Sequence, residues 1–329
     1  MIVTKNYINR SKIFLIHILL LQGLFVGAQQ NMMPPVRAHH SLVYDDAAKE
    51  ILLTGGSTPL DGGSSFKFYN DVWSFNGSKW ALKGNAGDER SGMALAYDTK
   101  RKKLYSFGGF TSDGKSRSEF RVLENDTWKN LGEIPGIIAA EAGFVYDSDR
   151  DKFIVFGGSP GMRKVNSETW EWDGNAWKKF DGAGPEGRQS FVMVYDEARK
   201  KTILYGGLSE TPGTMHDDTW EYDGKSWQKP SVNGPGARAS AGFAYDNEKK
   251  MLIIFGGMTK NGFTNETWSY DGSAWNKLSD QGPTKRAMRY LAYDKERKKV
   301  LLFGGRLGWP NDVNDTWEWN GTQWNELKF

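Results

Sequence analysis

The sequence predicts an all-β fold, a six-bladed β-propeller in which every blade is a four-stranded antiparallel sheet. The first observation is a repeat, because Gly-Gly pairs recur every 48 to 53 residues, a period typical of propellers and solenoids. The second is that each unit holds four short apolar runs separated by turn residues. The third is that no unit has helical periodicity. The pairs are Gly55-Gly56, Gly108-Gly109, Gly157-Gly158, Gly206-Gly207, Gly256-Gly257 and Gly304-Gly305.

The fourth unit illustrates the expected strands. Apolar or alternating runs cover 191–195, 202–205 and 219–222, and a fourth run begins at Trp227. A charged turn separates the first two runs, Gly206-Gly207 ends the second, and Asp223-Gly224 turns the chain before the last. Tight turns between short alternating runs indicate antiparallel hairpins, and four such strands make one propeller blade.

A solenoid is the competing arrangement for such a repeat. Stacked arrays need polar terminal caps, whereas the first and last units here are ordinary. We therefore expect a closed ring, with no blade shared between the termini unless the short segment 29–36 adds a strand. The propeller is expected over 37–329, with blades at about 37–84, 85–132, 133–182, 183–232, 233–281 and 282–329.

Residues 1–28 have the features of a secretory signal peptide. Lys5, Arg10 and Lys12 give a basic start, an apolar run follows over 13–26, and small residues end at Ala28. The run is short for a bilayer span, so an uncleaved anchor is the lesser alternative, and no Cys follows that could carry a lipid. We expect a secreted protein, or one in the periplasm or at the cell surface, without a membrane span.

Charge and cysteine content exclude several classes of function. Without residues 1–28 the chain has 40 Lys and Arg against 40 Asp and Glu, so nothing favours nucleic acid as a partner. The chain has no Cys, which removes thiolate nucleophiles and metal ligands, and roughly 300 residues can fold without disulfides. We expect a monomer.

Recurring residues are expected to build the scaffold. Only Gly accepts positive φ cheaply and allows a close backbone approach, which suits the Gly-Gly pairs. Tyr-Asp ends each first strand, and most units have two tryptophans seven residues apart, which we expect in the core between blades. These tryptophan pairs are Trp73/Trp80, Trp170/Trp177, Trp220/Trp227, Trp268/Trp275 and Trp317/Trp324. Unit two has Arg121 in place of the first tryptophan. This difference indicates either local repacking or a functional opening.

The run LLFGG followed by NDTWEWNGTQW resembles the kelch motif, and six units resemble the six-bladed kelch propellers of the galactose oxidase-like superfamily. The resemblance covers 37–329 and implies fold more than function, since such propellers serve as adaptors, cytoskeletal binders, oxidases and a sugar-acid epimerase. The copper-radical oxidase cofactor needs a Cys, so that activity is excluded. His39 and His40 are neighbours on a strand and face opposite ways, which is poor metal geometry, so we expect no cofactor and no metal.

Candidate binding residues lie on the face that carries the loops after Gly-Gly, because those loops vary while the opposite turns are uniform. The longest loop, Ser57–Asn70, contains Phe66 and Phe68, and the sixth contains Arg306 and Trp309. Residues at the start of a unit that do not recur from one unit to the next are also candidates. These are His39, His40, Glu141 and Arg289.

An arginine seven residues before the Tyr recurs in five units, and unit three has Ala139 instead. The five are Arg37, Arg90, Arg188, Arg238 and Arg286. The kelch resemblance implies that they line the central channel and hold carboxylates, while the alternative is a structural tie to a neighbouring Asp. The sequence therefore favours a binding module for a glycan or protein ligand, with an acidic one suiting the arginines. The second hypothesis is an enzyme similar to the kelch-type sialic acid epimerase, and catalytic residues are not identified.

Overall fold

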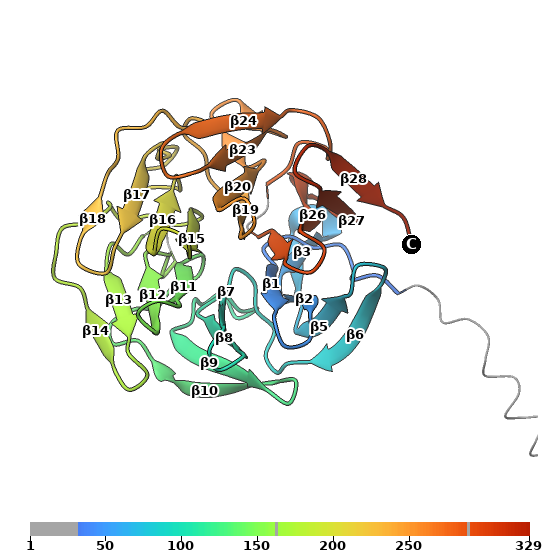
Figure 1. The fold of residues 1–329 in the computed structure, drawn as a ribbon. Coiled ribbons are helices and arrows are strands. Elements are labelled where there is room, and N and C mark those ends of the chain that lie inside the picture. The colour runs from blue at the N-terminus through green and yellow to red at the C-terminus, as the bar shows by residue number, and fades with distance from the viewer. Residues whose placement is uncertain (1–31, 162–163, 288–289) are drawn as a thin grey trace, which may run out of the picture. The chain divides into compact units, whose positions relative to one another are not determined.

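The computed structural model describes residues 32–161, 164–287 and 290–329, which form six four-stranded antiparallel sheets around one axis (Figure 1). Blade 1 contains β1 (Ser41–Asp45), β2 (Glu50–Thr54), β5 (Asp71–Phe75) and β6 (Trp80–Asn85). Blade 2 contains β7 (Ala94–Asp98), β8 (Lys103–Phe107), β9 (Glu119–Glu124) and β10 (Thr127–Glu133). Blade 3 contains β11 (Gly143–Asp147), β12 (Lys152–Phe156), β13 (Thr169–Trp172) and β14 (Trp177–Lys179).

The remaining three blades repeat this order. Blade 4 contains β15 (Val192–Asp196), β16 (Lys201–Tyr205), β17 (Thr219–Tyr222) and β18 (Trp227–Gln228). Blade 5 contains β19 (Gly242–Asp246), β20 (Met251–Phe255), β23 (Thr267–Tyr270) and β24 (Trp275–Ser279). Blade 6 contains β25 (Ala292–Asp294), β26 (Lys299–Gly308), β27 (Asn311–Trp319) and β28 (Trp324–Leu327). The prediction of an all-β propeller with six blades and almost no helix is confirmed.

Two small hairpins and one 3-10 turn complete the described secondary structure. The hairpin β3 (Ser57–Leu60) with β4 (Ser65–Phe68), joined by the turn η2 (Asp61–Gly63), projects from blade 1. The second, β21 (Met258–Thr259) with β22 (Gly262–Phe263), projects from blade 5. Both follow a Gly-Gly pair, so both lie on the face where the loops vary in sequence and length.

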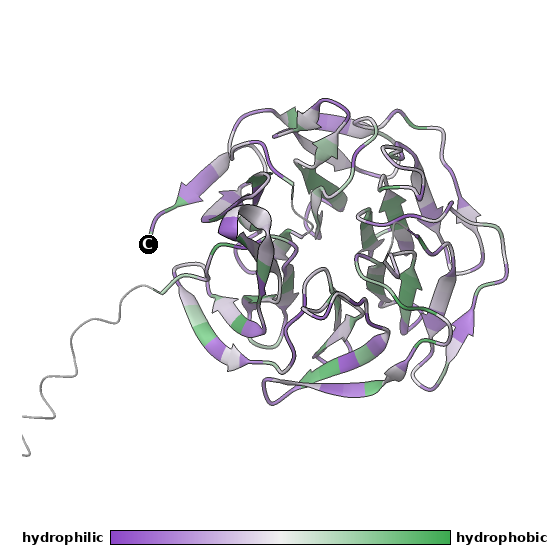
Figure 2. Ribbon diagram, turned by 180° about the vertical axis from the view of Figure 1, so that it is seen from behind, coloured by the Kyte–Doolittle hydropathy of each residue, from purple (hydrophilic) through white to green (hydrophobic). Residues whose placement is uncertain are grey.

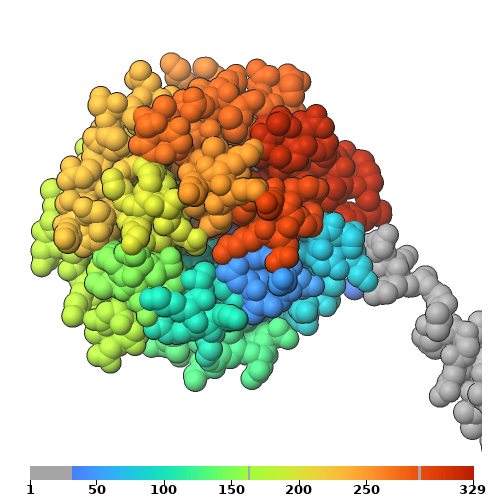
Figure 3. All heavy atoms as spheres, viewed as in Figure 1, coloured from blue at the N-terminus to red at the C-terminus, as the bar shows by residue number. Residues whose placement is uncertain are grey.

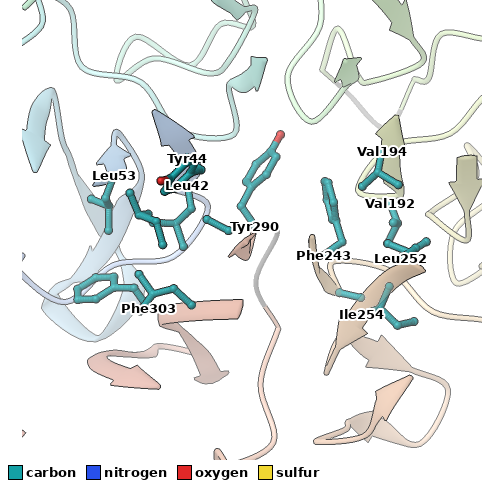
Figure 4. Packing of buried hydrophobic residues seen from close by; sticks show 14 of the residues in the cluster. Leu42, Tyr44, Leu53, Val192, Val194, Phe243, Leu252, Ile254, Tyr290 and Phe303 are labelled. Atoms are coloured by element: carbon teal, nitrogen blue, oxygen red, sulfur yellow. The ribbon is translucent and has the colours of Figure 1, made fainter. Parts of the chain in front are cut away.

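The inner strands carry the core. Their apolar side chains fill the spaces between blades, and hydrophobic colour is strongest on the inner strands, while the outer strands mix hydrophilic and hydrophobic segments (Figure 2). Leu42, Leu252 and Phe303, from blades 1, 5 and 6, belong to one continuous buried cluster. Phe243 of blade 5 and Tyr290, which precedes β25 of blade 6, belong to the same cluster, and their ring centroids lie 5.1 Å apart (Figure 4).

The Gly-Gly pairs join each blade to the next. The amide of the second Gly donates to the carbonyl that precedes the inner strand of the following blade, as in Gly207 N to Arg238 O at 2.9 Å. The same bond occurs at all six positions, and the last, Gly305 N to Arg37 O at 3.0 Å, joins blade 6 to blade 1. A Cβ on Gly206 would lie 2.5 Å from Arg238 O, so only Gly permits this approach.

Ring closure also uses the second tryptophan of the motif. Nε1 of Trp80 in blade 1 donates to Oγ1 of Thr316 in blade 6 at 3.1 Å. Trp227, Trp275 and Trp324 donate in the same way to Thr169, Thr219 and Thr267 of the preceding blade. Strand β25 also contacts β1, so the array is a closed ring and not a solenoid. Each blade takes its four strands from a single repeat unit, although the separate hairpins β3–β4 and β21–β22 interrupt the strand order of blades 1 and 5.

In blades 3 to 6 the first tryptophan is less deeply buried than we expected, although Trp73 of blade 1 is buried. Trp220 is partly exposed, and its Nε1 donates to Asp218 of its own blade at 2.8 Å. The expectation of a core position therefore fits the second tryptophan better, because the second one faces the wedge between two blades. Arg121, which replaces the first tryptophan of blade 2, is buried and bonds to Asp88 at 2.6 Å. This substitution is accommodated by local repacking.

The proposed signal peptide lies outside the described residues. In the part of the chain that the structure describes, no helix has the length and apolar character needed to cross a membrane.

Candidate functional site

Five described residues that lead into the inner strands form a hydrogen-bonded arc around the axis, which we call the axial ring. Its described members are His39, Gly92, Glu141, Ser190 and Ser240, each two residues after the motif arginine position. Their backbones are left-handed, with φ between 54° and 63°, a conformation that costs a non-Gly residue roughly 1–2 kcal/mol. From Gly92 onward each amide donates to the preceding member, as in Glu141 N to Gly92 O at 2.8 Å and Ser240 N to Ser190 O at 2.8 Å.

The shared backbone of the axial ring presents different side chains. Gly92 has none, and a Cβ there would lie 3.2 Å from Cγ of Glu141. Glu141 therefore extends across blade 2, and its Oε1 lies 3.0 Å from Nδ1 of His39 in blade 1. Its Oε2 accepts a hydrogen bond from the hydroxyl of Ser190 in blade 4. Because the His39 and Glu141 side chains remain about a quarter and a fifth exposed, a ligand can reach both.

A cavity of about 330 Å³ opens beside this pair on the loop face. Its walls come from blades 1, 2, 3, 4 and 6, and they combine hydroxyl groups, one amide, phenylalanine rings and a few ionisable groups. The lining residues are His39, Ser57, Phe66, Phe68, Ser91, Gly92, Phe110, Ser116, Ala140, Glu141, Ser159, Gly161, Gln189 and Arg306. The size lies at the lower end of the roughly 300–1,000 Å³ that small-molecule sites span.

The cavity exists because small residues meet over blades 1 to 3. The residue after Gly-Gly pairs with the residue after the motif arginine position, as in the bridges Ser91 with Phe110 and Ala140 with Ser159. In blade 4 the corresponding position holds Leu208, and in blade 5 it holds Met258. The small side chains of this set therefore leave space on one side of the axis, where Phe110 of blade 2 forms part of the wall, and larger apolar side chains fill the other side.

Aromatic rings form a row along one wall. Phe68 and Phe110 lie 6.1 Å apart between centroids, Phe66 and Phe68 lie 6.3 Å apart, and Phe66 and Trp309 lie 5.6 Å apart. The row starts in blade 2, crosses the β3–β4 hairpin of blade 1 and ends on the β26–β27 hairpin of blade 6. Figure 3 shows the tip of this last hairpin beside the blade 1 segment on the loop face.

Trp309 and Arg306, two of the predicted site residues, lie at the end of this row. Trp309 packs on Gly63, where a Cβ would lie only 2.6 Å from the indole ring, and it is 56% exposed. The Arg306 guanidinium lies 5.0 Å from the centre of the indole ring and bonds to Asp312, with Nε to Oδ1 at 2.8 Å. Arg306 therefore contributes a polar edge to the cavity while its charge is already compensated.

The five motif arginines, which the kelch resemblance suggested at the channel mouth, are buried and paired with acids. Their side chains are at most 4% exposed, and each bonds to an acid of its own blade. Arg188, for example, donates to Gly206 O at 3.1 Å and to both carboxylate oxygens of Asp218. The pairs are Arg37–Asp71, Arg90–Glu119, Arg188–Asp218, Arg238–Glu266 and Arg286–Asp315. This geometry favours the structural interpretation, since the guanidinium groups are buried and already bonded.

His40 is also part of the scaffold rather than the cavity wall. It is 2% exposed and lies against Phe303 of blade 6, with ring centroids 5.6 Å apart. Burial, and next the charge of Arg37, lower the pKa of His40 to about 3, although the Phe303 backbone slightly favours the protonated form. A neutral imidazole here fills the interface that closes the ring.

The structure thus brings His39, Glu141 and Arg306 together at one cavity, with Trp309 at its edge. Arg289 lies outside the described residues. The sequence analysis missed Ser57, Ser91 and Gln189 as candidates, because each looks like an ordinary loop residue. Aligning the six units on the position after Gly-Gly would have revealed Ser57 and also Ser159, since the other blades have Phe, Leu, Met or Arg there.

No family model and no curated protein matches the chain. Among the described residues no group of three or more His, Asp or Glu side chains is placed to hold a metal ion. A β-propeller of this kind is in general suited to binding, with variable loops held on a rigid ring.

Proposed function

We propose that this propeller is an extracytoplasmic binding module that takes a saccharide unit of a glycan into the loop-face cavity. The observation that carries the proposal is the composition of the cavity wall, which combines hydroxyl and amide groups with a row of phenylalanine rings. A pyranose needs both, because its hydroxyls form hydrogen bonds and its C–H faces pack on apolar rings. The proposed signal peptide supports the location outside the cytoplasm.

Charge favours a neutral saccharide over an acidic one. The five arginines that suggested carboxylate recognition are buried in ion pairs with their own blades, and the Arg306 charge is met by Asp312. Glu141 adds a negative group at the cavity floor. The epimerase hypothesis relied on an arginine-lined pocket, so the same burial removes its main support and leaves binding as the preferred function.

Isothermal titration of the purified mature protein against a glycan panel tests the proposal. The panel contains neutral mono- and disaccharides together with sialic acid and glucuronic acid. We expect saturable binding of at least one neutral saccharide and weaker binding of the acids. If no saccharide binds at millimolar concentration, the proposal is wrong.

Gly92→Ser provides a variant that narrows the cavity with little risk to the fold. Ser190 and Ser240 already occupy this backbone conformation in the axial ring, so serine is compatible with the local φ. The added side chain crowds Glu141 and should weaken saccharide binding at least tenfold. Ser240→Ala is the matched control, because Ser240 has the same ring position but does not line the cavity. Equal affinity of both variants would place the ligand elsewhere.

A further inference from the structure

We propose that the ligand is an extended glycan, with one sugar unit in the loop-face cavity and the next stacked on Trp309. This inference rests on the proposed function and adds the chain length of the ligand. The cavity of about 330 Å³ is near the lower limit for a small-molecule site. A glycan longer than one or two units must therefore continue over the rim of the cavity. The residues of the rim determine in which direction the glycan continues.

The apolar part of the cavity rim leads to Trp309. Phe66 lines the cavity and lies 5.6 Å from the Trp309 ring, so an apolar surface runs without interruption from the cavity to the indole. Phe66 is itself 42% exposed. The two residues belong to hairpins of blades 1 and 6 that adjoin on the loop face (Figure 3). A ligand leaving the cavity along this wall meets the indole next.

Trp309 has an accessible face. The ring packs on the Gly63 backbone and near the Arg306 guanidinium, yet 56% of the residue remains exposed. A tryptophan covered on both faces would expose only its edge, so one face must be open to solvent. Exposing so large an apolar surface is unfavourable in the free protein, and a ligand that covers it gains that free energy.

The surroundings of Trp309 suit a sugar better than an apolar ligand. Arg306 bonds to Asp312 with both Nε and Nη2, and the Asp312 side chain is fully buried. This bond fixes a guanidinium edge beside the indole. A sugar stacked on the ring would present hydroxyls at its periphery, within reach of such an edge. Rigid aromatic and polar groups of this kind lose little conformational entropy on binding.

The alternative is that Trp309 only clamps blade 6 to blade 1. A clamp of this kind would be visible as a loss of stability when Trp309 is changed, whatever the ligand. Ring closure already uses Gly305 N to Arg37 O and Trp80 to Thr316, both of which remain in a Trp309 variant. The two roles are therefore separable by measuring stability and affinity on the same protein.

The test is a chain-length series of glucose oligosaccharides, one to four units long, in both β-1,4 and α-1,4 linkage, with the corresponding β-1,4 galactose series. Kd is measured by titration for the wild type, Trp309→Ala and Trp309→Phe. For one series we expect at least a tenfold gain from one unit to two or three in the wild type. Trp309→Ala should lose that gain, bind the monosaccharide unchanged and melt within about 2 °C of the wild type. Trp309→Phe should retain part of the gain, and Leu278→Ala, an exposed apolar change on β24, should behave as the wild type.

Trp309 also supplies a direct optical readout. It is the one tryptophan in the described part of the chain that is largely exposed, so iodide should quench its fluorescence preferentially, and the longer oligosaccharides should protect it. A chain-length gain that survives in Trp309→Ala overturns the inference, as does monosaccharide binding with no gain in the wild type, and both leave the proposed function standing. Absence of binding to every saccharide overturns the proposed function as well.

Discussion

Oε1 of Glu141 lies 3.0 Å from Nδ1 of His39, although the two residues belong to blades 3 and 1. The contact is possible because Gly92, the axial-ring residue between them, has no side chain. Three blades with the same backbone thus produce a hydrogen-bonded floor for a cavity on one side of the axis. The ring that holds the blades together also sets the positions of the side chains that a ligand meets.

Arg188→Ala should destabilise the protein by about 3–5 kcal/mol, because it leaves a largely buried carboxylate without its partner. Burial alone would raise the pKa of Asp218, but the hydrogen bonds and charge of Arg188 outweigh it and lower that pKa to about 2. Chemical denaturation measures the loss. Lys229→Ala is the matched control, since Lys229 is exposed and lies 3.5 Å from the same carboxylate, and it should cost under about 1 kcal/mol.

The opposite pattern would restore the binding interpretation of the motif arginines. In that case Arg188→Ala would leave stability nearly unchanged and selectively weaken an acidic ligand. Blade 3 shows that the scaffold has another solution, since Ala139 replaces the arginine and Asn166 Nδ2 approaches Gly157 O at 3.5 Å. This natural exception offers only a weak contact, so we do not expect it to rescue Arg188→Ala.

Stability should fall as the pH drops below about 6.5, and His40 should cause much of the fall. His40 is neutral in the folded protein because burial lowers its pKa to about 3, whereas the unfolded chain takes up a proton near 6.5. The unfolded state therefore binds more protons between pH 6.5 and 3, which lowers the free energy of unfolding as pH falls. The expected loss from pH 8 to pH 5.5 is about 1.4 kcal/mol.

His40→Met should flatten this dependence. Met93 occupies the same position in blade 2 and packs near a Gly-Gly pair, so methionine suits the site. His216, whose pKa is also lowered by burial, remains in the variant and accounts for a smaller residual slope. Thermal melts from pH 8 to 5.5 decide the matter, and an equal slope in the wild type and His40→Met would show that other groups control the pH dependence.

The sequence was sufficient to predict the fold but only part of the site. Gly-Gly spacing and strand pattern determine the blades because the second glycine of each pair makes the same bond to the next blade. The role of Arg188 could have been inferred from a second repeat, because an acid two residues before the first tryptophan, such as Asp218, recurs with it. The cavity was not predictable in this way. It depends on which side chains the left-handed axial ring directs toward the axis, and spacing alone does not reveal that backbone conformation.

Trp227→Ala should cost about 3–5 kcal/mol, as is usual when a large core side chain is removed, and Trp220→Ala should cost less. Trp227 is 6% exposed and donates to Thr169 of blade 3, whereas Trp220 is partly exposed and bonds within its own blade. Trp227→Phe separates packing from hydrogen bonding, with about 1 kcal/mol expected for the lost bond. Denaturant titrations of the three variants give these values, and a larger cost for Trp220→Ala would reverse the assignment of the two positions.

Gly206→Ala should be far more damaging than Gly213→Ala, although both glycines lie in the fourth repeat and both have positive φ, 69° and 78°. The left-handed backbone costs either alanine roughly 1–2 kcal/mol. At Gly213 no atom lies within 4 Å of a new Cβ, whereas at Gly206 it would lie 2.5 Å from Arg238 O. The blades must then separate and weaken the bond from Gly207 N, which should add about 1–3 kcal/mol. The difference in unfolding free energy between the two variants therefore measures the close approach alone, and equal values would mean that the Gly-Gly pair serves only the backbone conformation.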